Sequence, residues 1–410
     1  MKNLLFIMTG VFPDDLSSGG KQAVYNCVDY LRNRYNTYIL YKENLPISEE
    51  TLSSLKREWS NVKFYSYKRD KKSLFTWVYL SIVILLKTLF RGELSSFKFE
   101  LLHRMVVTES LVKKIYQIID DNNIDGVVTE FYPASELCYC IPQGIKKIFI
   151  QHEIRYVRNL QVIRERCYKD NIIRFLYNKS KSEEIAAMNF NDAVITLTED
   201  DKDKLIRDGV KVPIYASPAA IASEIKEDPF KPAENLLSYL GGASHGRIKE
   251  AGVTWFLKKI WPLILEMMPN AKFQIIGNWN QEQREIFKDI KNVSFKGIVP
   301  DLSTCLPGTI MVVPLLVGSG MRMKALEGIV NKCAVVGTSI GLEGLPFKSG
   351  YDSYIENDPR NFAEKVVFLL NHPEKQTEFW NNSMKWYAKE YSKEALMQRR
   401  YDIIDGIIGK

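Results

Sequence analysis

Three ionisable residues near the middle of the second half of the chain, Arg322, Lys324 and Glu327, have the types and spacing of an anion-binding site. They follow an apolar stretch, Thr309–Val313, and a glycine turn, Gly318–Gly320. Glycines let backbone N–H groups approach an anion closely, and the N-terminus of a helix favours negative charge. Arginine and lysine at that end oppose the helix dipole, and a bound anion would relieve this cost. The pattern predicts a site for a diphosphate attached to a sugar, with the glutamate accepting hydrogen bonds from hydroxyl groups.

The same residues also fit a purely structural interpretation. Lys324 and Glu327 are three positions apart, so on a helix they can form a surface ion pair worth about 0.2–0.5 kcal/mol. A strand–glycine–helix turn also occurs wherever an α/β unit needs a tight connection. The rest of the chain has to decide between the two interpretations.

Length and composition narrow the class of protein. The 410 residues exceed one ordinary core, which predicts two domains. The chain is 46% hydrophobic and 26% charged, as soluble globular proteins are. Its net charge of +7 is spread among acidic residues, which suits an anionic substrate or membrane face and argues against a nucleic-acid partner. Cysteines without paired spacing and only 4 histidines predict a reduced cytosolic protein without a metal site.

Two apolar segments raise the question of a membrane. The run after Met1 is short and leads into Pro13-Asp14-Asp15 without a cleavage site, so it predicts a first core strand and not a signal peptide. Leu74–Leu86 carries no charge but is shorter than the ~20 residues that span a bilayer. It predicts a helix that is either core under the first sheet or laid on a membrane surface by its aromatic side chains and flanking lysines.

Short apolar runs alternate with helical patterns along both halves of the chain. This alternation predicts βαβ units with parallel sheets, whose binding sites lie at the carboxyl ends of the strands. The expected strands are Leu4–Met8, Thr37–Tyr41, Val62–Tyr67, Gly126–Glu130, Lys147–Gln151, Ala193–Leu197, Leu236–Leu240, Lys272–Ile276, Val293–Lys296, Ile310–Val313 and Ala334–Gly337. A helix is expected over Lys21–Arg34, and an amphipathic helix is expected over Lys393–Ile408.

The charged segment Ser223–Glu234 contains prolines and lacks periodicity, so it predicts a linker. The expected domains are residues 1–222, with a helical insertion near 71–112, residues 235–390, and a closing helix over 391–410. A glycine pair follows the first strand of each domain, Gly19-Gly20 and Gly241-Gly242. Two such halves facing each other would form a cleft.

Two doubly wound domains with this anion site resemble the GT-B glycosyltransferases. The second half is similar to the carboxyl-terminal domain of glycosyltransferase family four, because the order and spacing of its motifs agree throughout. These motifs are Trp255–Ile264, Met268–Gly277, Val293–Gly297, Val312–Glu327, Val335–Thr338 and Gly341–Leu345. In the first half the resemblance depends on Gly19-Gly20, on His152 after a strand, and on Thr196–Asp200.

The resemblance implies an activity. Enzymes of this family are retaining transferases that take a sugar from a nucleotide-diphosphate donor, and the departing phosphate takes the acceptor proton. The first domain would bind a glycan or lipid-linked acceptor, the second the donor, and the closing helix would pack back on the first domain. No cofactor besides the donor is implied. The setting would be polysaccharide or glycoconjugate synthesis in the cytoplasm, peripheral on the inner face of the cell membrane for a lipid-linked acceptor.

The resemblance also assigns roles in the second domain. Arg322 and Lys324 would neutralise the leaving diphosphate in place of a metal, since no Asp-x-Asp pattern ends a strand, and Glu327 would bind ribose hydroxyls. Many relatives carry a Glu-x7-Glu pattern, and here Ser319 stands at its first position. The backbone of the turn would then take over the missing contacts. The remaining expected nucleotide-binding residues are Gly242, Lys249, Gly318, Gly320 and Met321.

The first domain supplies the other candidates. His152 would contact the sugar or the acceptor, with a merely structural histidine as the alternative. Glu130 and Glu153 would bind the acceptor or else lie solvated at the rim. Gly19 and Gly20 would admit the sugar phosphate to the backbone or else simply form a tight turn.

Two other functions remain open at this point. A non-catalytic subunit that binds a nucleotide sugar would explain the missing first glutamate, although the intact Arg322, Lys324 and Glu327 favour turnover. A sugar-nucleotide epimerase shares the architecture, but the family-four motifs favour a transferase.

Overall fold

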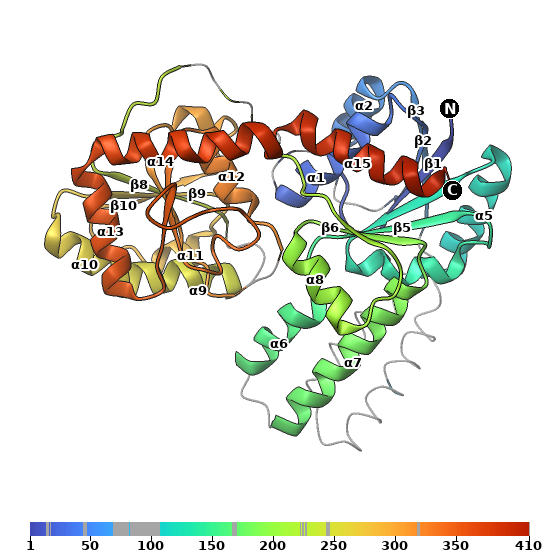
Figure 1. The fold of residues 1–410 in the computed structure, drawn as a ribbon, viewed down its shortest axis with the longest axis horizontal. Helices are drawn as coiled ribbons and strands as arrows, with labels where there is room; N and C mark the ends of the chain where they lie inside the picture. The colour runs from blue at the N-terminus through green and yellow to red at the C-terminus, as the bar shows by residue number, and fades with distance from the viewer. Residues whose placement is uncertain are drawn as a thin grey trace.

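The computed structural model describes residues 1–13, 16, 18–43, 47–68, 82, 107–165, 170–221, 223, 225, 228–242, 247–317 and 320–409. These residues fold into two α/β domains, each built on a parallel sheet with helices on both faces (Figure 1). The predicted architecture of two doubly wound domains is therefore confirmed.

The first sheet has the strand order β3-β2-β1-β4-β5-β6-β7 among the described residues. Its neighbouring strands are all parallel. The order reverses between β1 and β4, and ligands of such sheets bind at the carboxyl ends of the strands beside this point. The strands are β1 (Asn3–Met8), β2 (Asn36–Lys42), β3 (Val62–Tyr67), β4 (Gly126–Glu130), β5 (Lys146–Gln151), β6 (Ala193–Thr196) and β7 (Ile214–Ala216).

The second sheet has the order β10-β9-β8-β11-β12-β13 among the described residues, again parallel throughout. Its order reverses between β8 and β11, so the loops after these two strands lie beside each other. The strands are β8 (Leu236–Leu240), β9 (Lys272–Ile276), β10 (Val293–Gly297), β11 (Ile310–Val313), β12 (Ala334–Gly337) and β13 (Ser353–Ile355).

Helices connect the strands and cover both sheets. In the first domain they are α1 (Gly19–Leu31), α2 (Glu49–Glu58), α5 (Glu109–Asn122), the 3-10 helix η1 (Tyr132–Cys140), α6 (Arg155–Glu165), α7 (Asp170–Asn189) and α8 (Glu199–Asp208). In the second domain they are α9 (Arg247–Trp255), α10 (Trp261–Met267), α11 (Gln281–Glu285), α12 (Met323–Val330), α13 (Pro359–Asn371) and α14 (Pro373–Trp386), and the last helix, α15 (Lys393–Ile408), packs on the first domain. A π-helical turn, η2 (Phe256–Ile260), joins α9 to α10, and another, η4 (Tyr387–Tyr391), joins α14 to α15.

Most expected strands agree with the structure to within one residue, but the helix expected over Lys21–Arg34 both begins and ends earlier, at Gly19 and Leu31. Helix α1 begins at Gly19, not at Lys21, because the Ser18 side chain caps it by accepting from the Lys21 N–H. The two glycines therefore form the first helical turn and not a turn before the helix. Helix α12 begins at Met323, so Arg322 precedes the helix and does not lie in its first turn.

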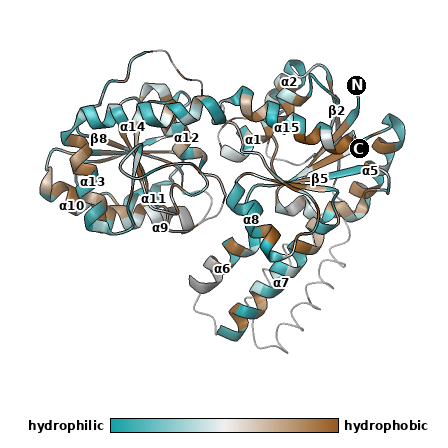
Figure 2. Ribbon diagram, in the orientation of Figure 1, coloured by the Kyte–Doolittle hydropathy of each residue, from teal (hydrophilic) through white to brown (hydrophobic). Residues whose placement is uncertain are grey.

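One apolar cluster runs through both domains. It joins Phe6 and Val28 of the first domain to Val313 and Leu326 of the second, and Ile404 of α15 belongs to it as well. Figure 2 shows hydrophobic residues concentrated in the strands, and hydrophilic residues on the outer turns of the covering helices. Burial of this shared surface stabilises the contact between the domains by roughly 25 cal/mol per Å² of apolar area.

The chain returns to the first domain at its end. Helix α14 lies on the second domain and α15 on the first, where the labelled C-terminus lies near the labelled N-terminus (Figure 1). Arg400 of α15 is fully buried and donates to the carbonyl oxygens of Ser217 and Pro218, and its Nε donates to Ser217 Oγ at 3.2 Å. These bonds tie α15 to the start of the connection between the domains.

The predicted insertion near 71–112 lies outside the described residues, apart from residue 82 and residues 107–112. Among the described residues, no helix combines the length and apolar character that crossing a bilayer requires.

Arg400 gives a stability prediction. Arg400→Leu removes three donors and leaves the Ser217 and Pro218 carbonyls buried without partners, so the free energy of unfolding should fall by about 2–4 kcal/mol. The neighbouring Arg399 is half exposed and pairs with an exposed Glu199, so Arg399→Leu should cost less than about 1 kcal/mol. Urea denaturation followed by fluorescence measures both; equal losses in the two variants would contradict this role of Arg400.

Candidate functional site

The glycine turn of the second domain lies against the end of β5 in the first domain. Gly320 has a φ of +82°, and a Cβ placed on it would lie 2.6 Å from the carbonyl oxygen of His152. No side chain fits at that distance, so glycine is required both for the conformation and for the approach. The two segments that the sequence predicted to face each other across a cleft are therefore in contact through their backbones.

Lys324 extends from the first turn of α12 to the end of β8. A Cβ placed on Gly241 would lie only 1.9 Å from its Nζ, and the ammonium lies 5.2 Å from the centre of the Tyr239 ring. The ammonium thus occupies the space that the missing side chain of Gly241 leaves open. Gly242 follows, and its backbone packs against that of Asn278. The positive charge lies at the point where the strand order reverses, which is where this type of sheet binds ligands.

Arg322 is buried and already has partners. Its Nε donates to the Ile340 carbonyl at 2.7 Å, and its Nη2 donates to Glu343 Oε2 at 2.8 Å. Desolvation lowers the pKa of the Arg322 guanidinium, and the Glu343 carboxylate opposes this shift. These two bonds hold the loop that contains Ile340 and Glu343, and the predicted contact of Arg322 with a diphosphate stays a prediction.

A carboxylate of the first domain completes this group. Asp201 of α8 is 8% exposed, and burial raises its pKa to about 6, with the Thr198 hydrogen bond opposing the shift and Glu343 adding to it. Thr198 also meets the second domain directly, since a Cβ on Gly344 would lie 2.6 Å from its Cγ2. The Arg322 loop and the start of α8 thus form a second contact between the domains.

Glu327 is buried on α12 and bound by residues from outside its domain. Its Oε1 accepts from Gln22 Nε2 of α1 at 3.1 Å, and its Oε2 accepts from the hydroxyl of Ser223. Burial raises the pKa of this carboxyl, and the two hydrogen bonds oppose the shift. Amide and hydroxyl donors on a buried carboxylate are the kind of partners that ribose hydroxyls would replace.

His152 and Glu130 form a buried pair at the ends of β5 and β4. His152 Nε2 lies 2.8 Å from Glu130 Oε2, and both side chains are 8% exposed. The other oxygen of Glu130, Oε1, is buried without a hydrogen-bond partner among the described residues. Phe131 stacks on the imidazole with ring centres 3.9 Å apart, and its φ of +66° is strained for a residue with a side chain. Such strain is common at functional sites and fixes the orientation of the ring pair here.

A cavity of ≈ 240 Å³ opens beside this pair. It is bounded by the loop after β1, by Phe131 and by the loop after β5, where Glu153 and Arg155 lie. Glu153 accepts from Arg158, whereas Nε of Arg155 is buried without a partner among the described residues. Arg155 thus brings a positive charge to the wall of the cavity, whereas Glu130 is not among the residues that bound it. The residues bounding it are Thr9, Gly10, Val11, Phe131, Tyr132, His152, Glu153 and Arg155.

Glu184 of α7 holds the loop that carries His152. It is buried and accepts from the backbone N–H groups of Arg155 and Tyr156 at 3.0 Å and from the amide of Gln151. A carboxylate at the first turn of α6 satisfies amides that have no partner within the helix. This position fixes where β5 ends and α6 begins, and so fixes the direction of the histidine.

The remaining predicted residues fall into two groups. A Cβ placed on Gly19 would lie 3.1 Å from Met323 Cγ, and one placed on Gly20 would lie 3.3 Å from the Phe131 ring. These glycines therefore allow α1 to pack closely on the second domain and on Phe131. Met321 is buried beside Gly344. Gly318 and Ser319 lie outside the described residues, and of Lys249 only its place in α9 is described. The catalytic and binding roles given to all these residues stay predictions.

Several residues of the site were not singled out from the sequence. Gln22, Ser223 and Tyr239 lie in segments whose patterns indicate only a helix, a linker and a strand. Glu343 belongs to the motif Gly341–Leu345 and Asp201 directly follows the motif Thr196–Asp200, but the approach of these two residues depends on how the domains pack. Arg155 is different, because it lies only three positions after His152 and the sequence places it near a predicted site residue.

The second domain matches a known family. Residues 236–372 match the model described as Glycosyl transferases group 1, and this segment contains the Gly241, Arg322, Lys324 and Glu327 positions. Residues 236–372 are therefore similar to a group 1 glycosyltransferase domain. A relative from Klebsiella pneumoniae, described as an uncharacterized 44.6 kDa protein in cps region, is 28% identical over 149 residues. That match covers 34% of this chain and only 38% of the relative.

Solved structures match the whole chain. The Staphylococcus aureus TarM structure in complex with Fondaparinux, alpha-GlcNAc-glycerol and UDP has a TM-score of 0.69 at 12% identity and covers 100% of both chains. Sucrose-phosphate synthase from Thermosynechococcus elongatus gives 0.70 at 13% identity, also covering 100% of both. HepE from Anabaena in complex with UDP gives 0.68 at 10% identity, covering 99% of this chain and 100% of its own. These likenesses establish the GT-B fold for both domains.

The position of the Lys324 ammonium leads to a binding prediction. Gly241→Ala places a methyl group where Nζ lies, so the affinity for a nucleotide diphosphate should fall by about 1.5–3 kcal/mol, the value of a charged hydrogen bond. Lys324→Ala should cause a similar loss, and the double variant should lose little more. Calorimetry with UDP, GDP and dTDP measures this, with Gly406→Ala as the control because a Cβ there meets nothing within 4 Å. Additive losses in the double variant would contradict a shared cause.

Asp201 leads to a pH prediction. Its pKa is raised from 3.8 to about 6 on folding, so the ionised carboxylate destabilises the folded state above pH 6, and this cost vanishes below pH 4. Asp201→Asn should therefore raise the free energy of unfolding by about 1–3 kcal/mol at pH 8, with a gain that shrinks as the pH falls toward 4.5. Denaturation series at pH 4.5, 6 and 8 measure it. A gain that stays constant over this range would show that the carboxylate does not titrate there.

Proposed function

We propose that this protein is a retaining glycosyltransferase that moves a sugar from a nucleotide-diphosphate donor to a glycan or lipid-linked acceptor. The observation that carries the proposal is the contact between the Gly320 turn and the His152 carbonyl, which brings the predicted donor and acceptor segments into one site. The group 1 glycosyltransferase match of the second domain supports the reaction class. The cps region named for the Klebsiella relative supports a role in polysaccharide synthesis.

The donor end of the site would work through charge. Lys324, whose ammonium lies at the end of β8, would contact the diphosphate, and such a fixed positive group stabilises the charge that develops on a leaving phosphate. Arg322 would add positive charge near the diphosphate, because Glu343 and the Ile340 carbonyl hold its guanidinium two residues after Gly320. Glu327 would exchange Gln22 and Ser223 for the ribose hydroxyls. UDP in the TarM and HepE structures is consistent with a donor of this kind.

The acceptor end would work through position. The cavity of ≈ 240 Å³ has room for the part of an acceptor that carries the attacking hydroxyl. Arg155 and Glu153, which bound the cavity, would bind its polar groups, and the stacked Phe131 and His152 rings would form the wall next to the transferred sugar. Fixing donor and acceptor in this way lowers the barrier by removing translational and rotational freedom before the reaction. The departing phosphate would take the acceptor proton, as expected for retention in this family.

The reaction would take place in the cytoplasm, with the protein peripheral on the inner membrane face when the acceptor is lipid-linked. The experiment that tests the proposal measures nucleotide release from a panel of UDP-, GDP-, dTDP- and ADP-sugars, with and without an acceptor extract. The proposal predicts release that requires both one donor and acceptor and that yields a sugar-labelled product. Binding without release would instead favour a non-catalytic subunit, and release of an isomerised nucleotide sugar would favour an epimerase.

His152 should be needed for transfer and not for nucleotide binding. His152→Ala should lower kcat/KM by about ten- to a thousand-fold and leave the affinity for free nucleotide nearly unchanged, as expected for a contact made in the transition state. His372→Ala is the matched control, since His372 lies between α13 and α14 in the second domain and does not bound the cavity. Wild-type turnover in a well-folded His152 variant would assign this histidine a structural role.

Metal removal should leave turnover intact. Because Lys324 and Arg322 supply positive charge at the expected diphosphate position, excess EDTA should change kcat by less than about twofold. Activity that disappears with EDTA and returns only with a divalent ion would show that a metal carries the leaving-group charge.

A further inference from the structure

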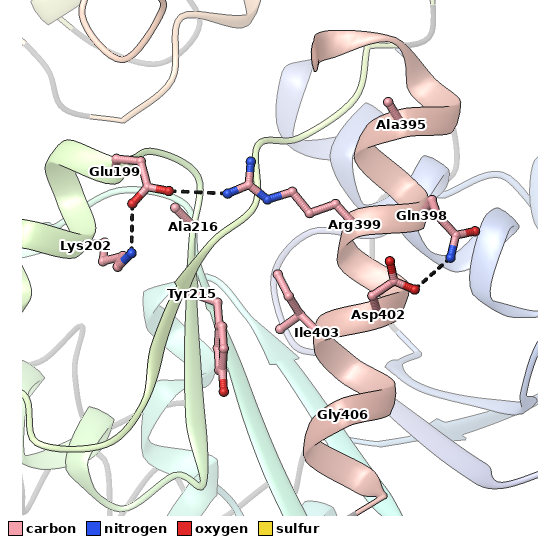
Figure 3. Close-up of a pocket in the computed structure, with 10 residues that line it drawn as sticks. All are labelled: Glu199, Lys202, Tyr215, Ala216, Ala395, Gln398, Arg399, Asp402, Ile403 and Gly406. Carbon is pink, nitrogen blue, oxygen red and sulfur yellow. Dashed lines mark hydrogen bonds and ion pairs between the residues drawn. The ribbon is translucent and has the colours of Figure 1, made fainter. Parts of the chain in front are cut away.

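A groove outside the candidate site lies between α8, β7 and α15. Its volume is ≈ 600 Å³, within the range of roughly 300–1,000 Å³ typical of small-molecule sites, and it shares no residue with the cavity beside His152. Figure 3 shows Tyr215 of β7 facing α15 across the groove, with Ile403 and Gly406 on the helix side. The groove is part of the first domain and of the closing helix, and the function proposed above makes no use of it.

The charges along the groove cancel. Glu199 pairs with Arg399 at 3.3 Å and with Lys202 at 2.9 Å, so a single carboxylate binds both cations (Figure 3). Asp402 adds a second negative charge on the opposite wall. A phosphate or sulfate would have to compete with Glu199 for both cations and would face Asp402. The groove therefore suits a ligand that is polar but uncharged.

The polar groups of the α15 wall are held in fixed directions. Gln398 Nε2 donates to Asp402 Oδ1 at 2.7 Å, and the Tyr30 hydroxyl donates to Gln398 Oε1 at 2.6 Å. The carboxylate of Asp402 keeps free acceptor positions, because it can accept several hydrogen bonds. A planar amide and a carboxylate held side by side match the alternating donors and acceptors of neighbouring sugar hydroxyls.

The floor of the groove has an apolar part. The partly buried ring of Tyr215 lies near Ile403, and Gly406 leaves the space above the helix open, since a Cβ there would meet nothing within 4 Å. An aromatic ring offers a flat surface to the C–H face of a sugar, and its hydroxyl remains available for hydrogen bonding. Aromatic floor, fixed polar wall and balanced charge together describe a carbohydrate site.

We propose that this groove binds a neutral glycan chain at a second site, apart from the reacting centre. The proposal extends beyond the proposed transfer reaction, because it depends only on the groove and would hold for a protein without turnover. Helix α8 carries both Glu199 of the groove and Asp201 of the contact between the domains, two residues apart in its first turn, so a chain in the groove would bind the same helical turn that takes part in that contact.

The test measures binding of maltohexaose, cellohexaose and chitohexaose to the full chain by calorimetry and saturation-transfer NMR. At least one should bind, Tyr215→Ala should weaken it at least tenfold, and Gly406→Trp should abolish it by filling the groove from a position without clashes. Tyr116→Ala is the matched control, because Tyr116 is an exposed tyrosine of α5 outside the groove. UDP affinity should be the same in all variants, which separates this site from the proposed donor site.

Three results would overturn the proposal. The first is that none of the three hexasaccharides binds the wild-type chain. The second is that the bound sugar is unaffected by both groove variants, or is lost with His152→Ala, which would place it in the cavity of the candidate site. The third is that a sulfated heparin hexasaccharide binds this groove more tightly than the neutral probes, which would contradict the charge argument.

Discussion

The approach of the Gly320 backbone to the carbonyl oxygen of His152 is the constraint on which the rest of the site depends. A methyl group at residue 320 would lie 2.6 Å from that oxygen, so the two domains meet backbone to backbone at this point. Such a contact fixes the distance between the domains more strictly than side chains do, because rotamers cannot absorb an error. The shared apolar cluster and the Arg400 bonds to Ser217 and Pro218 hold the domains in this relation.

The charged groups of the candidate site are buried with partners from other segments. Glu327 is bound by Gln22 and Ser223, and Arg322 by Glu343 and the Ile340 carbonyl. Unpaired, each would carry a desolvation cost of several kcal/mol. Because these partners are hydrogen-bonding groups, a ligand can replace them with little net change in the number of bonds. The bonds from Gln22 and Ser223 stabilise the buried Glu327 carboxylate, and in the proposed function ribose hydroxyls would replace them. This account needs no ion pair between Glu327 and Lys324.

The sequence predicted the fold better than the site. Strand positions followed from apolar runs such as Val62–Tyr67, whose length and turn signals are local properties. The three-residue strands β7 and β13 are too short to produce a pattern. The start of α1 was placed at Lys21 because glycine has low helix propensity, and the Ser18 cap outweighed that preference.

The contacts of the candidate site could not be predicted in the same way, because the residues that form each contact are distant in the sequence. His152 and Glu130 could be proposed separately from their positions at strand ends, but their pairing at 2.8 Å depends on adjacent strands. The burial of Arg322 against Glu343 depends on a loop conformation that no periodicity indicates. Gln22 and Glu327 lie in different domains, so only the packing of α1 on α12 brings them together.

A crystal structure of the chain with a bound nucleotide diphosphate tests the central claim most directly. The account predicts a phosphate oxygen within about 3.2 Å of Lys324 Nζ, next to the Gly320 turn, with the ribose on Glu327 and His152 facing the open side of the phosphate. Glu327 would then have exchanged Gln22 or Ser223 for a ribose hydroxyl. A nucleotide bound elsewhere, or bound here with Lys324 still over Tyr239 and Glu327 still on Gln22 and Ser223, would contradict the account.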